Sequence, residues 1–495
     1  MLNLDYIFRR RASRPAGQPK HMAENLPHWR LPRKRRARGF KSEISNIKRG
    51  DIMGESIWEK TADFREFKAL DRNTATDVLI IGGGLAGILS AWALTEAGID
   101  CLLIDSGRIC RGNTGNTSAK ITSQHGLIYS RLYRSFGADT ARGYWEANEK
   151  ALEQYRLLAE RLDCDFEEKD NYIYSTRSPR NLEAEMKVLE KLGIPARWKD
   201  RLSLPVDTAG AVVFSRQAQF NPLKLASGLA AGLNICENTR ALAFEGHTVI
   251  TNHGKIRADN IIIATHFPII NKHGGYFIKL YQSRSYVMAL ENAADLDGMY
   301  LDEVQGGLSF RNYGRLLLIG GGAHRSGKPG CGWEGLESFA GRAYPKTPEI
   351  CRWAAQDCIT LDGIPYIGDY SPGTGRLYVA TGFNKWGMTS SMVSARLLCD
   401  MIQGKPNPYA RIFSPRRSIL HPQLFANAAE ATANMLSFRR PRCPHLGCAL
   451  EWNSFEHSWD CPCHGSRFSD SGRLLDSPAT AGLKPEQLPA SHHDR

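Results

Sequence analysis

A short strand followed at once by a glycine-rich turn and a helix most restricts how this chain folds. The apolar run at 77–81 is rich in branched side chains and leads directly into Gly-Gly-Gly-Leu-Ala-Gly at 82–87. Helical periodicity covers 88–97, and a second apolar run at 101–104 ends on Asp105. This order predicts the opening unit of a dinucleotide-binding fold, an α/β architecture with a parallel sheet.

Each residue of this turn has a physical role in the predicted nucleotide site. Gly82 permits the tight turn, Gly84 lets the backbone approach a pyrophosphate, and Gly87 lets the helix pack closely on the strand. The pyrophosphate is expected at the N-terminus of the helix, where free N–H groups and the helix dipole favour negative charge. Asp105 is expected to accept hydrogen bonds from a ribose hydroxyl.

A polar, glycine-rich stretch follows at 107–120. Its composition suits a segment that runs beside a long ligand, and it makes Thr117, Ser118 and Lys120 candidate cofactor contacts. A simple surface loop is the alternative interpretation.

Net charge is concentrated at the N-terminus. The chain has 64 Lys and Arg against 51 Asp and Glu, a net charge of +13, and residues 1–50 alone hold 14 basic and 3 acidic residues. Residues 1–52 are therefore expected to be a basic, disordered extension. Binding to nucleic acid or an anionic surface, a transit peptide, and a start-site artefact before Met53 are the alternatives. No specific nucleic-acid partner is expected.

The apolar runs and the cysteines indicate the cellular compartment in which the protein is expected. No run approaches the roughly 18 apolar residues that cross a bilayer, and no signal-peptide core is present at the start. Eight of the 12 cysteines are scattered singly, as is usual for buried thiols in a reducing cytosol. We expect a soluble, cytoplasmic protein.

The other four cysteines lie in one C-terminal cluster with two histidines. Cys443 and His445 form one Cys-x-His loop, and Cys461 and His464 form a Cys-x-x-His loop. Two loops of one Cys and one His each suit a Rieske [2Fe–2S] centre. Zinc is the competing assignment, although zinc sites usually place two like ligands in each loop.

Several later segments carry a resemblance to a known family. Taken with the N-terminal unit, they make the chain resemble the flavoprotein superfamily of D-amino-acid oxidase and glycine oxidase from about residue 57 to about residue 403. The segments are 217–224, 258–266, 362–368 and 378–389.

The resemblance implies FAD as the cofactor. It makes 258–265 a strand that returns to the FAD domain, which places Thr265 near the dinucleotide. It makes 382–389 a turn and helix start that closes on the flavin ring. Gly382, Gly387 and Met388 are the contacts expected there, and Lys385 is expected to stabilise anionic reduced flavin. A solvated surface charge is the alternative for Lys385.

The resemblance also implies the domain organisation. FAD-binding parts are expected at about 74–144, 216–266 and 346–403, within an oxidoreductase region spanning 53–403. Parts that cover the substrate are expected at about 145–215 and 267–345, with helices at 138–162 and 179–192 and strands at 286–290 and 316–319. The residues considered for binding a substrate carboxylate, each of which could equally be structural, are Arg284, Arg311, His324 and Arg325.

At the C-terminus, resemblance to Rieske proteins places Cys443 and Cys461 on one iron and His445 and His464 on the other. It also implies a disulfide between Cys448 and Cys463. The expected linker, 404–442, is too short for the usual base of such a domain, so the Rieske module at 443–485 is expected to be truncated. The cluster is then either held by packing on the flavin domain or poorly retained.

The fold class expected is therefore an α/β, two-domain FAD-binding flavoprotein of the glutathione-reductase type, with a mixed-sheet substrate domain and a small all-β Rieske module. The expected function is oxidation of a small amine or amino-acid-like substrate by hydride transfer to flavin. Electrons are then relayed through the [2Fe–2S] cluster to a one-electron acceptor, either a protein or a quinone-like molecule. No catalytic acid or base is assigned. The alternatives are a plain FAD oxidase that uses oxygen and a non-catalytic redox sensor.

Overall fold

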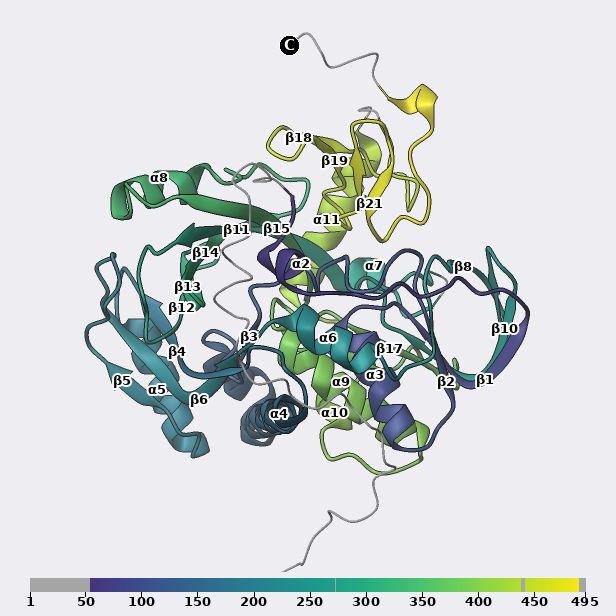
Figure 1. Ribbon diagram of the computed structural model, residues 1–495, viewed down its shortest axis with the longest axis horizontal. Helices are drawn as coiled ribbons and strands as arrows, with labels where there is room; N and C mark the ends of the chain where they lie inside the picture. Colours follow the sequence, from purple (N-terminus) through teal and green to yellow (C-terminus); the bar gives the residue numbers. More distant parts are fainter. Residues whose placement is uncertain (1–53, 272, 438–440, 489–495) are drawn as a thin grey trace, which may run out of the picture. The chain divides into compact units, whose positions relative to one another are not determined.

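The computed structural model describes residues 54–271, 273–437 and 441–488 (Figure 1). The basic extension at 1–52 lies outside these residues. Within them, no helix has the length and apolar character that spanning a membrane requires.

The first sheet contains the strands of the predicted dinucleotide-binding unit. Its strand order is β16-β17-β10-β1-β2-β7, and β1 pairs in parallel with both β10 and β2. The strands are β1 Thr74–Ile81, β2 Cys101–Ile104, β7 Ile235–Cys236, β8 Ala241–Glu245, β9 Thr248–Thr251, β10 Lys255–Ile263, β16 Tyr366–Asp369 and β17 Leu377–Thr381.

Strand β1 shows why its sequence is apolar throughout. Because side chains alternate along a strand, Val78 and Ile80 enter one hydrophobic core while Leu79 and Ile81 enter another on the opposite face. A strand buried on both faces carries a continuous apolar run, as in parallel sheets generally. Helices α3 and α9 pack against each other beside this sheet.

The second sheet carries the predicted substrate side. Its order is β15-β11-β14-β13-β12-β4-β6-β3, with β5 paired to β6, and parallel and antiparallel pairs are mixed. The strands are β3 Lys120–Ile121, β4 Glu167–Ser175, β5 Arg197–Lys199, β6 Gly210–Gln219, β11 Leu280–Glu291, β12 Gly298–Asp302, β13 Ser309–Tyr313, β14 Leu316–Arg325 and β15 Glu349–Thr360.

The helices agree with the expected positions, with differences at their ends. The helix expected at 138–162 is the second part of α4, which starts at Ile128 and is kinked at Gly137, where φ is 84°. The helices are α2 Ile57–Thr61, α3 Leu85–Glu96, α4 Ile128–Arg161, α5 Arg180–Leu192, α6 Pro222–Ala230, α7 Tyr276–Lys279, α8 Glu334–Ala343, α9 Gly387–Ile402, α10 Ala410–Phe413 and α11 Pro422–Leu436.

The C-terminal module, yellow in Figure 1, has a four-stranded antiparallel sheet in the order β18-β19-β20-β21. Its own small core contains Leu450, Trp459 and Phe468 together with four cysteines. The segment at 404–442, predicted to be a linker, includes α10 and α11. The strands are β18 Glu451–Asn453, β19 Ser458–Asp460, β20 Arg467–Ser469 and β21 Leu474–Asp476, and a short 3-10 helix, η1, covers Pro485–Gln487.

Candidate functional site

A cavity of about 620 Å³ lies at the end of β1 where the glycine turn leads into α3. Parallel strands end at one edge of a sheet, and ligands of open α/β folds bind at that edge. Nine of the twelve predicted FAD contacts line the cavity. They are Gly82, Gly84, Asp105, Thr117, Thr265, Gly382, Lys385, Gly387 and Met388.

The turn glycines leave the space that a dinucleotide needs. A Cβ on Gly82, whose φ is +112°, would lie 2.5 Å from the Ala264 carbonyl oxygen. A Cβ on Gly84 would lie 3.3 Å from the Thr114 hydroxyl, which itself accepts a hydrogen bond from the Leu85 N–H in the first turn of α3. The turn therefore forms a cradle at a helix N-terminus, which suits a pyrophosphate.

Asp105 is held in place by backbone groups. Its carboxylate accepts hydrogen bonds from the N–H groups of Gly83, at 2.7 Å, and Gly107, at 2.8 Å. Burial raises the pKa of Asp105, and these two hydrogen bonds oppose that rise. A fixed carboxylate facing the cavity is suited to accept hydrogen bonds from a ribose.

Basic side chains also line the cavity. Lys385 has its accessible surface on the cavity wall, and burial lowers its pKa while Asp357 opposes that shift. His266 also lines the cavity, and its buried Nε2 has no hydrogen-bond partner. A cavity lined by an unsatisfied imidazole nitrogen and an ammonium group fits a polar ring system such as flavin.

The other three predicted contacts are described residues that do not line the cavity. Gly87 acts through packing, because a Cβ there would lie 1.9 Å from the Gly82 carbonyl oxygen. The Ser118 carbonyl accepts a hydrogen bond from Arg311 at 2.8 Å. Lys120 is buried on β3, and burial, together with the nearby Arg311, lowers its pKa to about 7.

Sequence reasoning missed most of the other lining residues, among them His266, Gln356, Asp357 and Phe383. His266 and Phe383 lie in segments that carried the resemblance, whereas Gln356 and Asp357 lie in β15 without any motif. Pairing of β15 with β11 across the second sheet, which local sequence does not encode, brings them to the cavity.

The C-terminal cysteines and histidines meet in one place. The ligand atoms of Cys448, Cys461, Cys463 and His464 all lie within 4.8 Å of one another. Cys443 interacts with the Cys461 thiol, and the rings of His445 and His464 have centroids 4.8 Å apart. All four predicted iron ligands therefore belong to this cluster.

The two histidines have the donor atoms that a metal centre requires. Nδ1 of both His445 and His464 is buried and has no hydrogen-bond partner. Nε2 of His445 lies 2.9 Å from Asn271 Oδ1. A free Nδ1 on each of two adjoining rings, next to thiols, fits a cluster with two cysteine and two histidine ligands.

The predicted disulfide is not formed in the structure, where all twelve cysteines are thiols. Cys448 and Cys463 nevertheless share one cluster. The pairing therefore stays a prediction.

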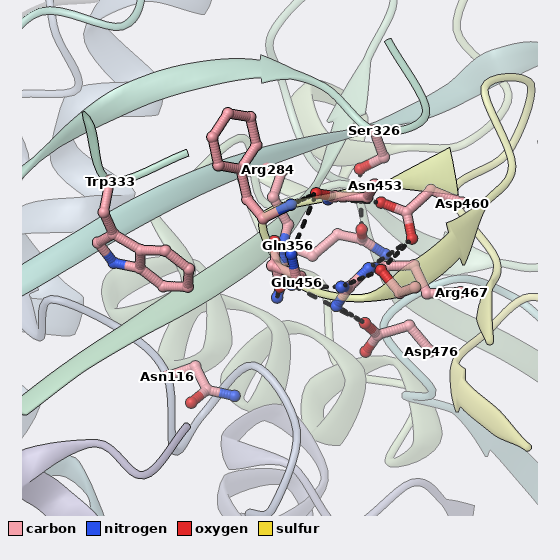
Figure 2. A network of polar contacts seen from close by, with 12 residues as sticks. Asn116, Arg284, Ser326, Trp333, Gln356, Asn453, Glu456, Asp460, Arg467 and Asp476 are labelled. Carbon is pink, nitrogen blue, oxygen red and sulfur yellow. Dashed lines mark hydrogen bonds and ion pairs between the residues drawn. The ribbon is translucent and has the colours of Figure 1, made fainter. Parts of the chain in front are cut away.

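A buried ion network joins the C-terminal module to the second sheet (Figure 2). Arg284 on β11 binds the Glu456 carboxylate through Nε, at 2.9 Å, and Nη2. Arg467 binds the same carboxylate at 2.8 Å and also binds Asp460 and Asp476. The side chains of Arg284 and Glu456 are each 9% exposed. Burial would raise the pKa of Glu456, but the Arg284 and Arg467 guanidiniums outweigh burial and hold it at about 2.

Two glutamines attach the ligand loop directly to the same sheet. Gln282 Nε2 donates to the His464 carbonyl at 2.7 Å and to the Ser477 carbonyl at 2.9 Å. Gln356 Nε2 donates to the Gly465 carbonyl at 2.8 Å. The backbone of the ligand loop lies close to Gln282 at Gly465, because an added Cβ on Gly465 would lie 2.6 Å from Gln282 Cβ. The short module therefore packs on the flavin domain through its ligand loop, and retention of the cluster by this packing stays a prediction.

The arginines considered for a substrate carboxylate have other partners. Arg284 serves the ion network, and Arg325 donates to the carbonyls of Pro462, at 2.9 Å, and Cys463, at 3.1 Å. His324 Nδ1 lies 3.1 Å from the Gly322 carbonyl. Arg311 is buried within the flavin domain against the Ser118 and Ala119 carbonyls. No residue of this set is therefore assigned to a substrate.

Comparison with known proteins identifies a family for each of the two parts of the chain. The family described as "FAD dependent oxidoreductase" matches residues 77–401, and "Rieske [2Fe-2S] domain" matches residues 431–487. The chain belongs to the FAD-dependent oxidoreductase family. Its cofactors are FAD and a Rieske [2Fe–2S] cluster, and it is an oxidoreductase enzyme.

Relatives of this FAD-dependent oxidoreductase include proteins with one or both parts. The Bacillus subtilis (strain 168) protein YhfW, which is named as a Rieske 2Fe-2S iron-sulfur protein, is 34% identical over 87% of this chain and 97% of its own length. Gamma-glutamylputrescine oxidoreductase of Escherichia coli (strain K12) is 23% identical over 69% of this chain and 87% of its own length.

Solved structures support the fold of the flavoprotein part. Glycine oxidase from Geobacillus kaustophilus has a TM-score of 0.59 at 21% identity and covers 70% of this chain and 99% of its own. L-proline dehydrogenase from P. horikoshii has a TM-score of 0.57 at 18% identity, with coverages of 70% and 98%. The expected fold class, a glycine-oxidase-like flavoprotein with a small all-β Rieske module, is confirmed.

Proposed function

We propose that this FAD-dependent oxidoreductase oxidises a small amine or amino-acid-like substrate and passes the electrons through its own Rieske cluster to a one-electron acceptor. Bound FAD would accept a hydride, and a [2Fe–2S] cluster carries one electron at a time. The acceptor is then a protein or a quinone-like molecule. The amine class rests on likeness to relatives named for glycine, proline and γ-glutamylputrescine.

One observation carries the relay part of the proposal. His266 lines the FAD cavity, and the next residue, Phe267, is fully buried with its ring edge-on to both cluster histidines. Its ring centroid lies 6.2 Å from that of His445 and 6.4 Å from that of His464. Two consecutive residues therefore connect the flavin cavity to the ligands of the cluster.

Gln356 provides a second connection between the two sites. Its side chain lines the cavity and donates to the Gly465 carbonyl in the ligand loop. Ser326 Oγ donates to Gln356 Oε1 at 2.8 Å, and Gln356 Nε2 also donates to Gln282 at 3.0 Å. These bonds fix the Gln356 amide in one orientation between the cavity and the ligand loop.

The chain's residues have defined tasks in this proposal. The glycine turn and Asp105 bind the dinucleotide, and Lys385 stabilises negative charge at the flavin end of the cavity. The cysteines and histidines of the C-terminal loops hold the cluster, while Gln282, Gln356 and Arg284 keep it docked.

The test is a comparison of the protein with a variant in which His445 and His464 are both replaced by alanine. Glycine, L-proline and γ-glutamylputrescine serve as candidate substrates, and amine loss and hydrogen peroxide are both measured in air. We expect the unmodified protein to form much less peroxide than amine consumed when an acceptor such as oxidised cytochrome c is present. We expect the variant to divert its electrons to oxygen. Equal peroxide and amine in both proteins would instead identify a plain oxidase.

A further inference from the structure

A segment of the Rieske module forms part of the wall of the FAD cavity. Residues 474–477, 479 and 480 line it, together with the glycine turn and Asp105 of the flavin domain. We propose that residues 474–480, called here the wall segment, are part of the FAD-binding site, and that FAD enters and leaves only when the module is displaced. This inference holds whether or not electrons pass to the cluster.

Leu475 is the leucine of the wall segment that the module's core does not hold. Leu474 lines the cavity but also packs against that core, so Leu475 beside it projects from the opposite face of β21. Leu475 is 41% exposed although it is a large apolar residue, and it lines the cavity. An apolar side chain presented to this cavity is suited to contact an aromatic ring of FAD.

The wall segment is tied down at four points, one of which is the hydrogen bond from Gln282 Nε2 to the Ser477 carbonyl. Asp476 binds Arg467 at 3.1 Å, and the Ala479 N–H donates to Ser466 Oγ in the ligand loop at 2.9 Å. The Thr480 carbonyl accepts a hydrogen bond from Arg240 Nη1 of the flavin domain at 3.0 Å. Arg240 follows Thr239, whose N–H donates to the Asp105 carbonyl at 2.7 Å. The wall segment therefore reaches from the ion network to the end of the cavity that Asp105 occupies.

Displacing the wall segment requires breaking the docking contacts. Those contacts include the buried Arg284–Glu456 pair and the two hydrogen bonds from Gln282 to module carbonyls. Docking should thus slow FAD release, since the module must be displaced before FAD can dissociate. By linkage, bound FAD should stabilise the docked module to the same extent.

The test measures FAD release from the full-length holoprotein. The protein is diluted, and the rise of free-FAD fluorescence is followed over time. Leu475→Asp places a charge on the cavity wall and should speed FAD release roughly ten-fold or more, because an apolar contact is replaced by a desolvated carboxylate. The matched control is Leu157→Asp, since Leu157 on α4 is 44% exposed and does not line the cavity. It should release FAD at the unmodified rate.

A second variant keeps the proposal testable if Leu475→Asp disturbs the module. Glu456→Gln weakens docking and leaves Leu475 unchanged. Glu456 does not line the cavity, although its partners Arg284 and Arg467 do. The EPR signal of the reduced cluster, recorded for both variants, shows that the module is folded. Faster release in either variant with an intact signal supports the proposal. Unchanged release in both, again with an intact signal, would overturn it.

Discussion

Replacing Gly87 with alanine is expected to abolish FAD binding. A Cβ at this position would lie 1.9 Å from the Gly82 carbonyl oxygen and 3.4 Å from Leu103 Cδ1. The first contact is with backbone, so helix α3 or the glycine turn must move. Overpacking of this kind costs about 1–3 kcal/mol or more, and the displacement falls on the cradle for the pyrophosphate.

The measurement is the ratio of FAD to protein after purification, read from the flavin absorption band. Gly341→Ala is the matched control, because Gly341 lies in helix α8 and an added Cβ would meet no atom within 4 Å. That variant should retain its FAD and gain a little helix stability. A Gly87→Ala protein with full FAD content would contradict the dinucleotide site described here.

Glu456→Gln should release the Rieske module from the flavin domain. The carboxylate neutralises two buried arginines, and its loss leaves Arg284 and Arg467 without that charge. Removing one partner of a buried pair costs about 3–5 kcal/mol. We expect urea unfolding at pH 7, monitored by the fluorescence of the module's tryptophans, to show a decrease of this size in the free energy of unfolding.

The same pair predicts how this difference depends on pH. The pKa of Glu456 is about 2 in the folded protein against an ordinary value of 4.5. A carboxyl group whose pKa is lowered on folding stabilises the protein at pH values above its ordinary pKa. That stabilisation is lost as the pH falls from the ordinary pKa toward the pKa in the folded protein. The difference in free energy of unfolding between the unmodified protein and Glu456→Gln should therefore be constant from pH 7 to 5 and shrink below about pH 4.5. A difference in free energy of unfolding that increases as the pH falls would contradict the assignment of this ion pair.

Local patterns were sufficient to predict which residues come together at the two candidate cofactor sites. The glycine turn, Asp105 and the two Cys and His loops are short stretches whose backbone geometry is set within a few residues. The structure accordingly places Gly82, Gly84 and Asp105 on one cavity, and Cys443, His445, Cys461 and His464 in one cluster.

The contact between the two sites could not be predicted in the same way. Arg284 and Glu456 are separated by 172 positions, and Gln356 and Gly465 by 109. Nothing near Arg284 in the sequence distinguishes an arginine that binds a substrate from one that binds another domain. Only the pairing of β11 with β15 brings Gln282, Arg284 and Gln356 to a common edge.

The most direct test of the central claim needs no substrate. The flavin of the full-length protein is reduced by light without air, and the sample is frozen after successive exposures for EPR. Electron passage through Phe267 and Gln356 predicts that the anisotropic signal of a reduced Rieske cluster appears with flavin reduction. It also predicts that the signal fails to appear in FAD-free Gly87→Ala protein treated identically. A fully bleached flavin beside a cluster that stays oxidised would contradict the relay.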